Sequence, residues 1–334
     1  MRRRFLLMAS LALVLGLAVP LWLGGQMLFP TLGRVQGLHL AGMLGLILLA
    51  WNLNAGRVRL LVGGMDCCRL SHWQALGVVM ATEFAISATP GGSGGPPTYG
   101  YLLQQHGLTP AHALAIYTVD QLVDMLFFLS ALVVIAASNL WAPTNWYAGQ
   151  QILFLGGLIV LGLAFFVGLV RHYRQLLLFI GRMLRRLGVG ARGRRWMMRR
   201  ILEYRLGLLR VRRFPPSRLW AVYGLCVGHW LLRYSILYLA VREVGGMIDW
   251  TYAFLVQMLS LSIGQATLMP GGSGGAEASA GLLLLPHLTA GTAAGAVLIW
   301  RFVTFYWYLI AGAPVFALLA GRPAWRGIQR QTTD

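Results

Sequence analysis

Six long apolar stretches divide the chain, and each is long enough to cross a bilayer as a helix. About 20 apolar residues in a helix span a hydrocarbon core of about 30 Å. The stretches are Phe5–Gly25, Val35–Ala55, Pro110–Ala136, Gln150–Val170, Leu219–Val241 and Thr289–Ala320. The first is too long for the apolar region of a signal peptide, so we interpret it as a retained signal-anchor helix. The pattern predicts an all-α polytopic membrane protein with six full spans.

Two further apolar segments are interrupted in the middle. Residues 73–109 and 251–288 each consist of two short limbs around the same hexapeptide, Pro-Gly-Gly-Ser-Gly-Gly. It runs from Pro90 to Gly95 and again from Pro270 to Gly275. Glycine and proline interrupt helices, and the limb Trp73–Thr89 would reach only about 25 Å as a helix. We therefore expect two re-entrant hairpins with the hexapeptides at their tips.

The distribution of arginine sets the expected orientation. The chain is 57% hydrophobic, has a mean hydropathy of +0.66 and has a formal charge of +19, and all 28 of its basic residues are arginine. If neither hairpin crosses the bilayer, 24 of these arginines lie on the side of the two termini. Because positive loops stay in the cytosol, we predict a plasma (inner) membrane protein with cytosolic N and C termini.

This topology makes the chain an inverted repeat. Residues 1–136 and 150–320 each contribute three spans and one hairpin, joined by an outer loop at 137–149 and followed by a cytosolic tail at 321–334. Inverted repeats bring equivalent broken segments together near the middle of the bilayer and allow alternating access. We therefore expect the two glycine loops to face each other.

A basic insertion at 171–218 stands apart from the spans. Its leucines recur at helical spacing among arginines, which is typical of an amphipathic helix on the inner leaflet. We expect contact with anionic lipid headgroups there, and no nucleic-acid partner. The cysteines Cys67, Cys68 and Cys226 are expected to be reduced thiols, and we expect neither metal nor cofactor. A homo-oligomer is compatible with the sequence.

The glycine loops are the first candidate substrate site. Without side chains the backbone can approach a ligand closely, and amides before a helix favour an anion. The candidate residues are Gly91, Gly92, Ser93, Gly94, Gly95, Gly271, Gly272, Ser273, Gly274 and Gly275. The simpler alternative is that these glycines only permit tight turns. No Gly-Lys-Ser/Thr follows either loop, so a nucleotide P-loop is excluded.

Charged residues inside apolar segments are the second set of candidates, because each needs a partner or a wet cavity. They are Glu83, Asp120, Asp124, Glu277, Arg233 and Arg301. When the hexapeptides are superposed, Asp120 and Asp124 flank the equivalent of Arg301. An Arg301–acid pair is therefore expected, either as a static salt bridge or as part of transport. His39 and His229 are weaker candidates for proton relays.

These residues resemble the flippase-like transmembrane family typified by the membrane region of lysylphosphatidylglycerol synthase. In that family each half has a Pro-Gly-rich loop, an acidic motif follows the first loop and a Glu follows the second. The matching residues are Asp120-Gln121-Leu122-Val123-Asp124, Glu277, and Arg301 with Phe305 and Tyr306. Gln121 stands where the family has Arg. The resemblance implies lipid flipping without aminoacyl transfer, because the soluble synthase domain is not in this chain.

The leading hypothesis is a flippase or secondary transporter for a phosphate-bearing lipid, and transport is favoured over catalysis. The loop amides, Arg301 and Arg233 would hold the phosphate. Glu277, Asp120, Asp124 and Glu83 would bind a headgroup cation or couple transport to protons, since no ATP motif is present. Alternatives are a transporter of a small anionic solute, a membrane-embedded transferase, or a non-catalytic subunit of an envelope-lipid pathway. We expect Glu277→Gln to fold and to stop translocation.

Overall fold

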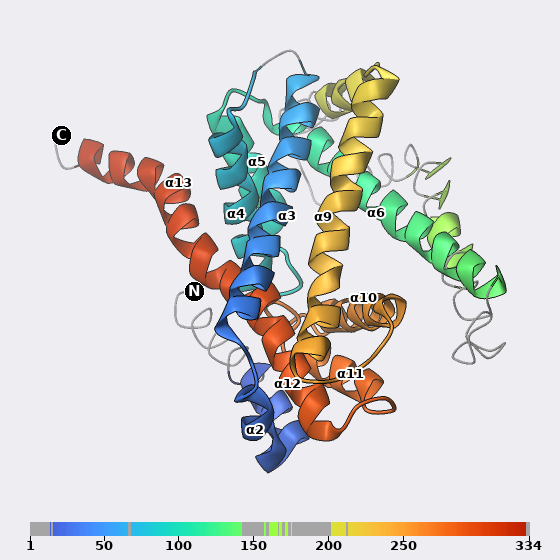
Figure 1. Cartoon of the computed structure of the whole chain (residues 1–334). Coiled ribbons are helices and arrows are strands. Elements are labelled where there is room, and N and C mark those ends of the chain that lie inside the picture. Colours follow the sequence, from blue (N-terminus) through green and yellow to red (C-terminus); the bar gives the residue numbers. More distant parts are fainter. Residues whose placement is uncertain are drawn as a thin grey trace. The chain divides into compact units, whose positions relative to one another are not determined.

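The computed structural model describes residue 14, residues 16–65, 68–141, 157, 160–165, 167–168, 171–172, 175, 202–211 and 213–331. Every regular element in these residues is helical (Figure 1). The predicted all-α class is therefore confirmed for the described part of the chain. Residues 5–13 and 15 of the predicted span 5–25, most of the predicted span 150–170 and most of the basic insertion lie outside the described residues.

Four helical stretches are long and apolar enough to cross a membrane. They are Gly37–Gly63 in α3, Pro110–Ser138 in α6 (Pro110–Trp141), Pro216–Glu243, which is α9, and Ala290–Ala320. The last combines α12 (Ala290–Arg301), the π-helical turn η2 (Phe302–Tyr306) and the start of α13 (Trp307–Gln331). These four coincide with four of the six predicted spans. With many large apolar side chains exposed, they make this a membrane protein.

One predicted span is shorter than its helix. The second span was expected to end at Ala55, but α3 continues to Gly63. Arg57 is buried within it. Arginine has good helix propensity, so its charge lowers the local hydropathy without ending the helix.

Two pairs of short helices correspond to the predicted hairpins. In the first pair α4 (His72–Ala88) contacts α5 (Gly95–Gln105), and in the second α10 (Trp250–Ala266) contacts α11 (Gly275–Leu284). Ser71 begins α4 through a reciprocal capping box with Gln74. In each pair the hexapeptide forms the turn between the two helices.

The order of helices repeats at an offset of 178 to 180 residues. Gly63 and Glu243 end α3 and α9, Gly95 and Gly275 begin α5 and α11, and α6 and α12 begin at 110 and 290. The N-cap of the last pair is also repeated, because the hydroxyls of Thr109 and Thr289 each accept a backbone N–H three residues later. The chain therefore contains an internal duplication at the level of its helices.

The described residues fall into two compact units. The larger unit is formed by Met1–Leu108 together with Gly224–Asp334, and the smaller unit is Thr109–Tyr223. The smaller unit contains α6, the helical residues 202–211 and the start of α9. Within it the Thr118 hydroxyl accepts from Tyr204 at 3.1 Å, and Ser130 and Tyr223 share a hydrogen bond of 2.6 Å. The larger unit contains both glycine loops and is where the buried polar residues described below lie.

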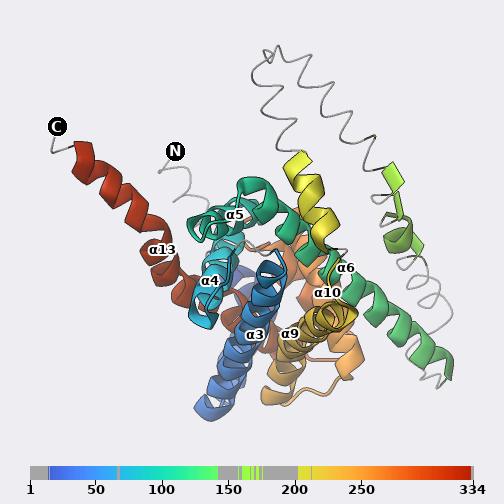
Figure 2. The same ribbon diagram turned by 90° about the horizontal axis from the view of Figure 1, so that it is seen from above.

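In the larger unit α3 and α9 run antiparallel to each other (Figures 1 and 2). At one end the Glu243 carboxylate accepts the backbone N–H of Gln36 at 2.5 Å and contacts His39 at 2.6 Å. Further along, Gly56 of α3 faces Leu225 of α9. The beginning of α3 therefore lies near the end of α9.

The N-terminal residues 16–32 pack on α11 and α12 through glycines. Leu23 lies against Gly281, and the backbone of Met27 lies against Gly291, where a Cβ would come within 3.0 Å of the Met27 carbonyl oxygen. Gly16 lies against the Tyr306 hydroxyl. Small residues allow such close helix packing in membranes. The N-terminal segment thus covers the helices that carry Glu277 and Arg301.

Candidate functional site

The first two glycines of each loop share a left-handed backbone conformation, whereas the fourth glycine differs: Gly94 has a φ angle of −76° and Gly274 has a φ angle of +85°. Gly91 and Gly92 have φ angles of +55° and +71°, and their equivalents Gly271 and Gly272 have +58° and +67°. In both loops the serine amide donates to the carbonyl of the proline three residues earlier, at 3.1 and 3.2 Å. Only glycine adopts consecutive left-handed conformations at low cost, which explains the repeated Gly-Gly pair.

The loops contact each other directly. Pro90 and Pro270, which occupy the same position in the two hexapeptides, form an antiparallel β-bridge. The expectation that the two loops face each other is therefore confirmed. The two prolines are equivalent residues of the two repeats. A two-fold axis between two copies of a unit brings equivalent residues together in this way.

The second loop differs from the first in what surrounds it. A Cβ on Gly272 would lie 2.8 Å from the carbonyl carbon of Gly264 in α10, whereas a Cβ on Gly92 would meet only side chains, the nearest being Ile86 at 3.3 Å. At this position the second loop is packed on helix backbone and the first is not; in the first loop a Cβ on Gly94 would lie 2.9 Å from the Ala85 carbonyl oxygen. Gly264 is part of this site, and the sequence analysis missed it because nothing in its local sequence marks it.

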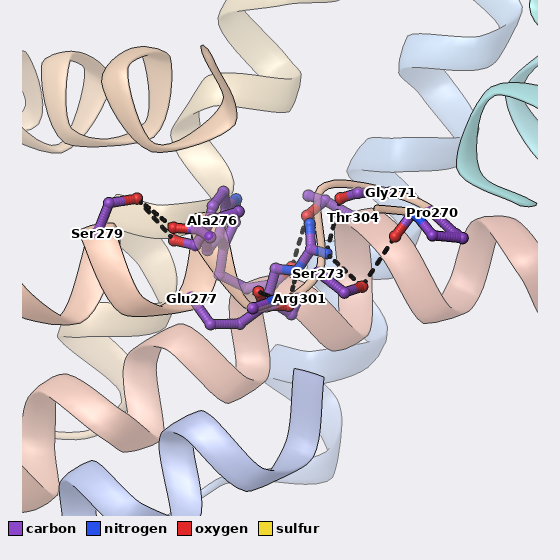
Figure 3. A network of polar contacts seen from close by, with 11 residues as sticks. Pro270, Gly271, Ser273, Ala276, Glu277, Ser279, Arg301 and Thr304 are labelled. Carbon is purple, nitrogen blue, oxygen red and sulfur yellow. Dashed lines mark hydrogen bonds and ion pairs between the residues drawn. The ribbon is translucent and has the colours of Figure 1, made fainter. Parts of the chain in front are cut away.

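Arg301 and Glu277 form a buried ion pair beside the second loop (Figure 3). The Arg301 Nε donates to the Glu277 Oε1 at 2.6 Å, and both residues are at most 2% exposed. The Glu277 Oε2 accepts the backbone N–H of Gly274 at 2.7 Å, so this carboxylate also caps α11. Glu277 therefore has a partner for each oxygen.

The same guanidinium also holds the loop. Arg301 Nη2 donates to the Gly271 carbonyl at 2.9 Å and lies 3.5 Å from the Ser273 hydroxyl. The Phe305 ring lies 4.4 Å from the guanidinium carbon, in cation–π geometry. The π-helical turn η2 begins directly after Arg301, and such turns occur often at functional sites. Arg301 thus ties the second loop to α12.

A second ion pair lies elsewhere in the larger unit. Arg233 of α9 contacts Glu83 of α4 at 3.2 Å, and its guanidinium carbon lies 5.2 Å from the Trp230 ring and 5.0 Å from the Tyr308 ring. The Gln257 side chain donates to the Arg233 carbonyl at 3.3 Å. The structure therefore pairs two sequence-predicted residues that the sequence analysis had not paired.

The predicted residues are distributed as follows. Arg301, Glu277 and the second loop converge, and the first loop joins them through the proline bridge. Asp120 and Asp124 belong to α6 in the smaller unit, so their pairing with Arg301 stays a prediction. Pro97 stands in the first repeat where Glu277 stands in the second. The charged part of this site is therefore asymmetric although the first two glycines of each loop have the same conformation.

Comparison with known proteins places the chain in a family. Residues 8–312 match the family described as the lysylphosphatidylglycerol synthase TM region, so the chain belongs to that family. A relative from Archaeoglobus fulgidus, described as a UPF0104 membrane protein, is 23% identical over 271 residues, which are 79% of this chain and 81% of the relative. The class of protein is thus a polytopic membrane protein of this family.

Proposed function

We propose that this protein moves a phosphate-bearing lipid, a phospholipid or glycolipid, between membrane leaflets by alternating access of two inverted repeats. The observation that carries the proposal is the antiparallel bridge between Pro90 and Pro270. It puts two broken helical segments, one from each repeat, in contact at their equivalent residues. Discontinuous helices that meet in this way form the substrate sites of many transporters.

The antiparallel course of α3 and α9 supports the inverted topology. These helices occupy equivalent places in the two repeats, and the Glu243–His39 contact joins the end of one to the beginning of the other. Equivalent spans that cross the membrane in opposite directions are what an inverted repeat requires. In this arrangement the hairpins enter from opposite faces and meet near the middle of the bilayer.

The buried arginine provides the anion-binding group. Arg301 is engaged by Glu277 and the Gly271 carbonyl, and the amides of Gly92, Ser93, Gly272 and Ser273 are used within their turns. A lipid phosphate would therefore replace Glu277 on Arg301 as the loop opens. Guanidinium groups suit phosphate and carboxylate equally in geometry, so one group can exchange between the two anions.

Reconstitution into liposomes tests this proposal. Liposomes carrying a headgroup-labelled phospholipid are treated with a membrane-impermeant quencher, and wild-type protein is expected to expose label from the inner leaflet that stays protected in protein-free liposomes. Uptake of free glycerophosphate without lipid movement would instead favour the solute transporter. The lipid proposal would be refuted if the inner-leaflet label stayed as protected as in protein-free liposomes for every headgroup tried.

Cysteine labelling tests the topology separately. In a variant without Cys67, Cys68 and Cys226, single cysteines at Ser138 and Arg200 should react with an impermeant maleimide from opposite faces of the membrane. The reason is that Arg200 lies in the basic insertion, which the positive-inside rule keeps in the cytosol. Labelling of both positions from the same face would contradict the two-hairpin topology.

A further inference from the structure

The helical residues 16–24 lie over the carboxylate of the buried ion pair. A Cβ on Gly16 would overlap the Tyr306 hydroxyl and would lie 3.3 Å from the Glu277 Oε1. The phenol oxygen and the carboxylate oxygen therefore converge on one point of this helix. Only a residue without a side chain allows the helix to approach both of them, which explains the glycine at this position.

The Tyr306 hydroxyl is a free polar group beneath this helix. Tyr306 follows Arg301 by five residues, and the intervening turn η2 is π-helical, which brings residues five apart close together. The hydroxyl oxygen is buried and has no hydrogen-bond partner among the described residues. Because buried polar atoms are nearly always hydrogen-bonded, this hydroxyl is available to a polar group that enters beside Arg301.

The opposite face of the same helix is apolar and exposed. Leu21 is 44% exposed and Trp22 is 86% exposed. The buried positions are Gly16, Pro20 and Gly24, which follow one another at four-residue spacing and so share one face. In a membrane protein an exposed apolar face contacts lipid. The helix therefore lies between the ion pair and the surrounding lipid.

Gly25 separates this helix from the residues that follow it. Its φ angle is +51°, a left-handed conformation that glycine adopts at low cost. A Cβ there would have no neighbour within 4 Å, so packing does not require the glycine. The next helix, α2 (Leu28–Leu32), lies beside α12 (Figure 1), and Thr31 packs on Gly295. Hinges are a few residues at the ends of elements that absorb a backbone change, and Gly25 has this position.

We propose that residues 16–24 form a lateral gate, hinged at Gly25, through which a phosphate-bearing lipid headgroup reaches Arg301 from the bilayer. This inference rests on the proposed function. The closed gate covers Glu277 and the Tyr306 hydroxyl. When the gate swings away, the phosphate replaces Glu277 on Arg301 and accepts a hydrogen bond from the Tyr306 hydroxyl. The acyl chains remain in the lipid while the headgroup enters.

Two disulfides, one on each side of the hinge, give the first test. In a variant without native cysteines, Leu23→Cys with Gly281→Cys ties the gate to α11, because the Leu23 Cγ lies 3.8 Å from the place of a Cβ on Gly281. Thr31→Cys with Gly295→Cys is the matched control, since their Cβ atoms would be 3.7 Å apart, a distance that suits a disulfide. Lipid movement should stop in the first variant on oxidation and recover on reduction. It should continue in the second.

The other outcomes of this test contradict the proposal. Lipid movement at an unchanged rate with the first disulfide closed would overturn the gate. Failure of the first pair to cross-link would contradict its closed position. Loss of movement with both disulfides would overturn the hinge at Gly25, because α2 would then have to move as well.

A second test does not depend on transport. Spin labels on cysteines at Trp22 and Leu282, which are 86% and 65% exposed, measure the distance between the gate and α11 in nanodiscs. Gly25→Ala disfavours the left-handed backbone of the closed gate and should raise the ratio of the long to the short distance about 5–30-fold. Gly42→Ala in α3, where a Cβ also has no neighbour within 4 Å, should leave the ratio unchanged.

The two tests separate the gate from the proposed function. An unchanged distance in Gly25→Ala would overturn the gate even if the wild-type protein moves lipid. A shifted distance in a protein that moves no lipid would refute the proposed function and leave the hinged gate standing.

Discussion

Replacing Arg301 by Gln is expected to destabilise the protein by about 3–5 kcal/mol, and Glu277→Gln by a similar amount, because each leaves the other charge buried without its partner. The structure thus changes the expectation that Glu277→Gln folds normally. The double variant should be destabilised by less than the sum of the two single variants, with a coupling of about 2–3 kcal/mol. The free energy of unfolding in bicelles measures all three.

Two controls make this cycle specific. Arg242→Gln removes an exposed arginine from the last turn of α9 and should change stability by less than about 0.5 kcal/mol. Combining Arg301→Gln with Asp120→Asn and Asp124→Asn tests the predicted contact with α6. Additive effects there would leave Glu277 as the sole carboxylate partner of Arg301. Additive effects in the Glu277–Arg301 cycle itself would contradict the ion pair.

Gly272→Ala should be among the most damaging alanine substitutions in the two loops, together with Gly271→Ala, whose Cβ would overlap the Phe305 ring. A left-handed φ costs a non-glycine residue about 1–2 kcal/mol, and overpacking adds about 1–3 kcal/mol more. The added Cβ would meet the Gly264 backbone at 2.8 Å, and this backbone cannot move aside as a side chain can. We expect a loss of about 2–5 kcal/mol and of lipid translocation. Unfolding and translocation assays on the same preparation measure both.

The first repeat supplies the matched variant. Gly92→Ala has the same backbone strain, but its Cβ would meet the Ile86 side chain at 3.3 Å, so it should cost only about 1–2 kcal/mol. Gly45→Ala in α3, where a Cβ would have no neighbour within 4 Å, should be neutral or slightly stabilising. Equal losses in Gly92→Ala and Gly272→Ala would show that packing against Gly264 is unimportant.

Much of the architecture could be predicted because it depends on local sequence patterns, namely the length of apolar stretches and the repeated hexapeptide. Four of the spans followed from apolar length, and the contact between the glycine loops followed from one repeated hexapeptide and the logic of inverted repeats. The end of α3 was missed because hydropathy falls at Arg57 while helix propensity does not.

The pairing of charges could not be predicted in the same way. Superposing the repeats gives the equivalent backbone positions, and from these positions an acid of α6 was predicted to pair with Arg301. It does not say which carboxylate a long side chain reaches. Glu277 lies 24 residues from Arg301, and only the turn between α11 and α12 brings the two together.

A disulfide across the proline bridge tests the central claim most directly. Paired residues of antiparallel strands have Cα atoms about 4.5–5.5 Å apart, within the range that a disulfide spans. In a variant without native cysteines, Pro90→Cys with Pro270→Cys should cross-link on mild oxidation. The cross-linked protein should stop moving lipid and recover on reduction, while each single cysteine variant is unaffected by the oxidant. Failure to cross-link, or translocation at an unchanged rate after cross-linking, would contradict a lipid pathway that depends on the two loops moving apart.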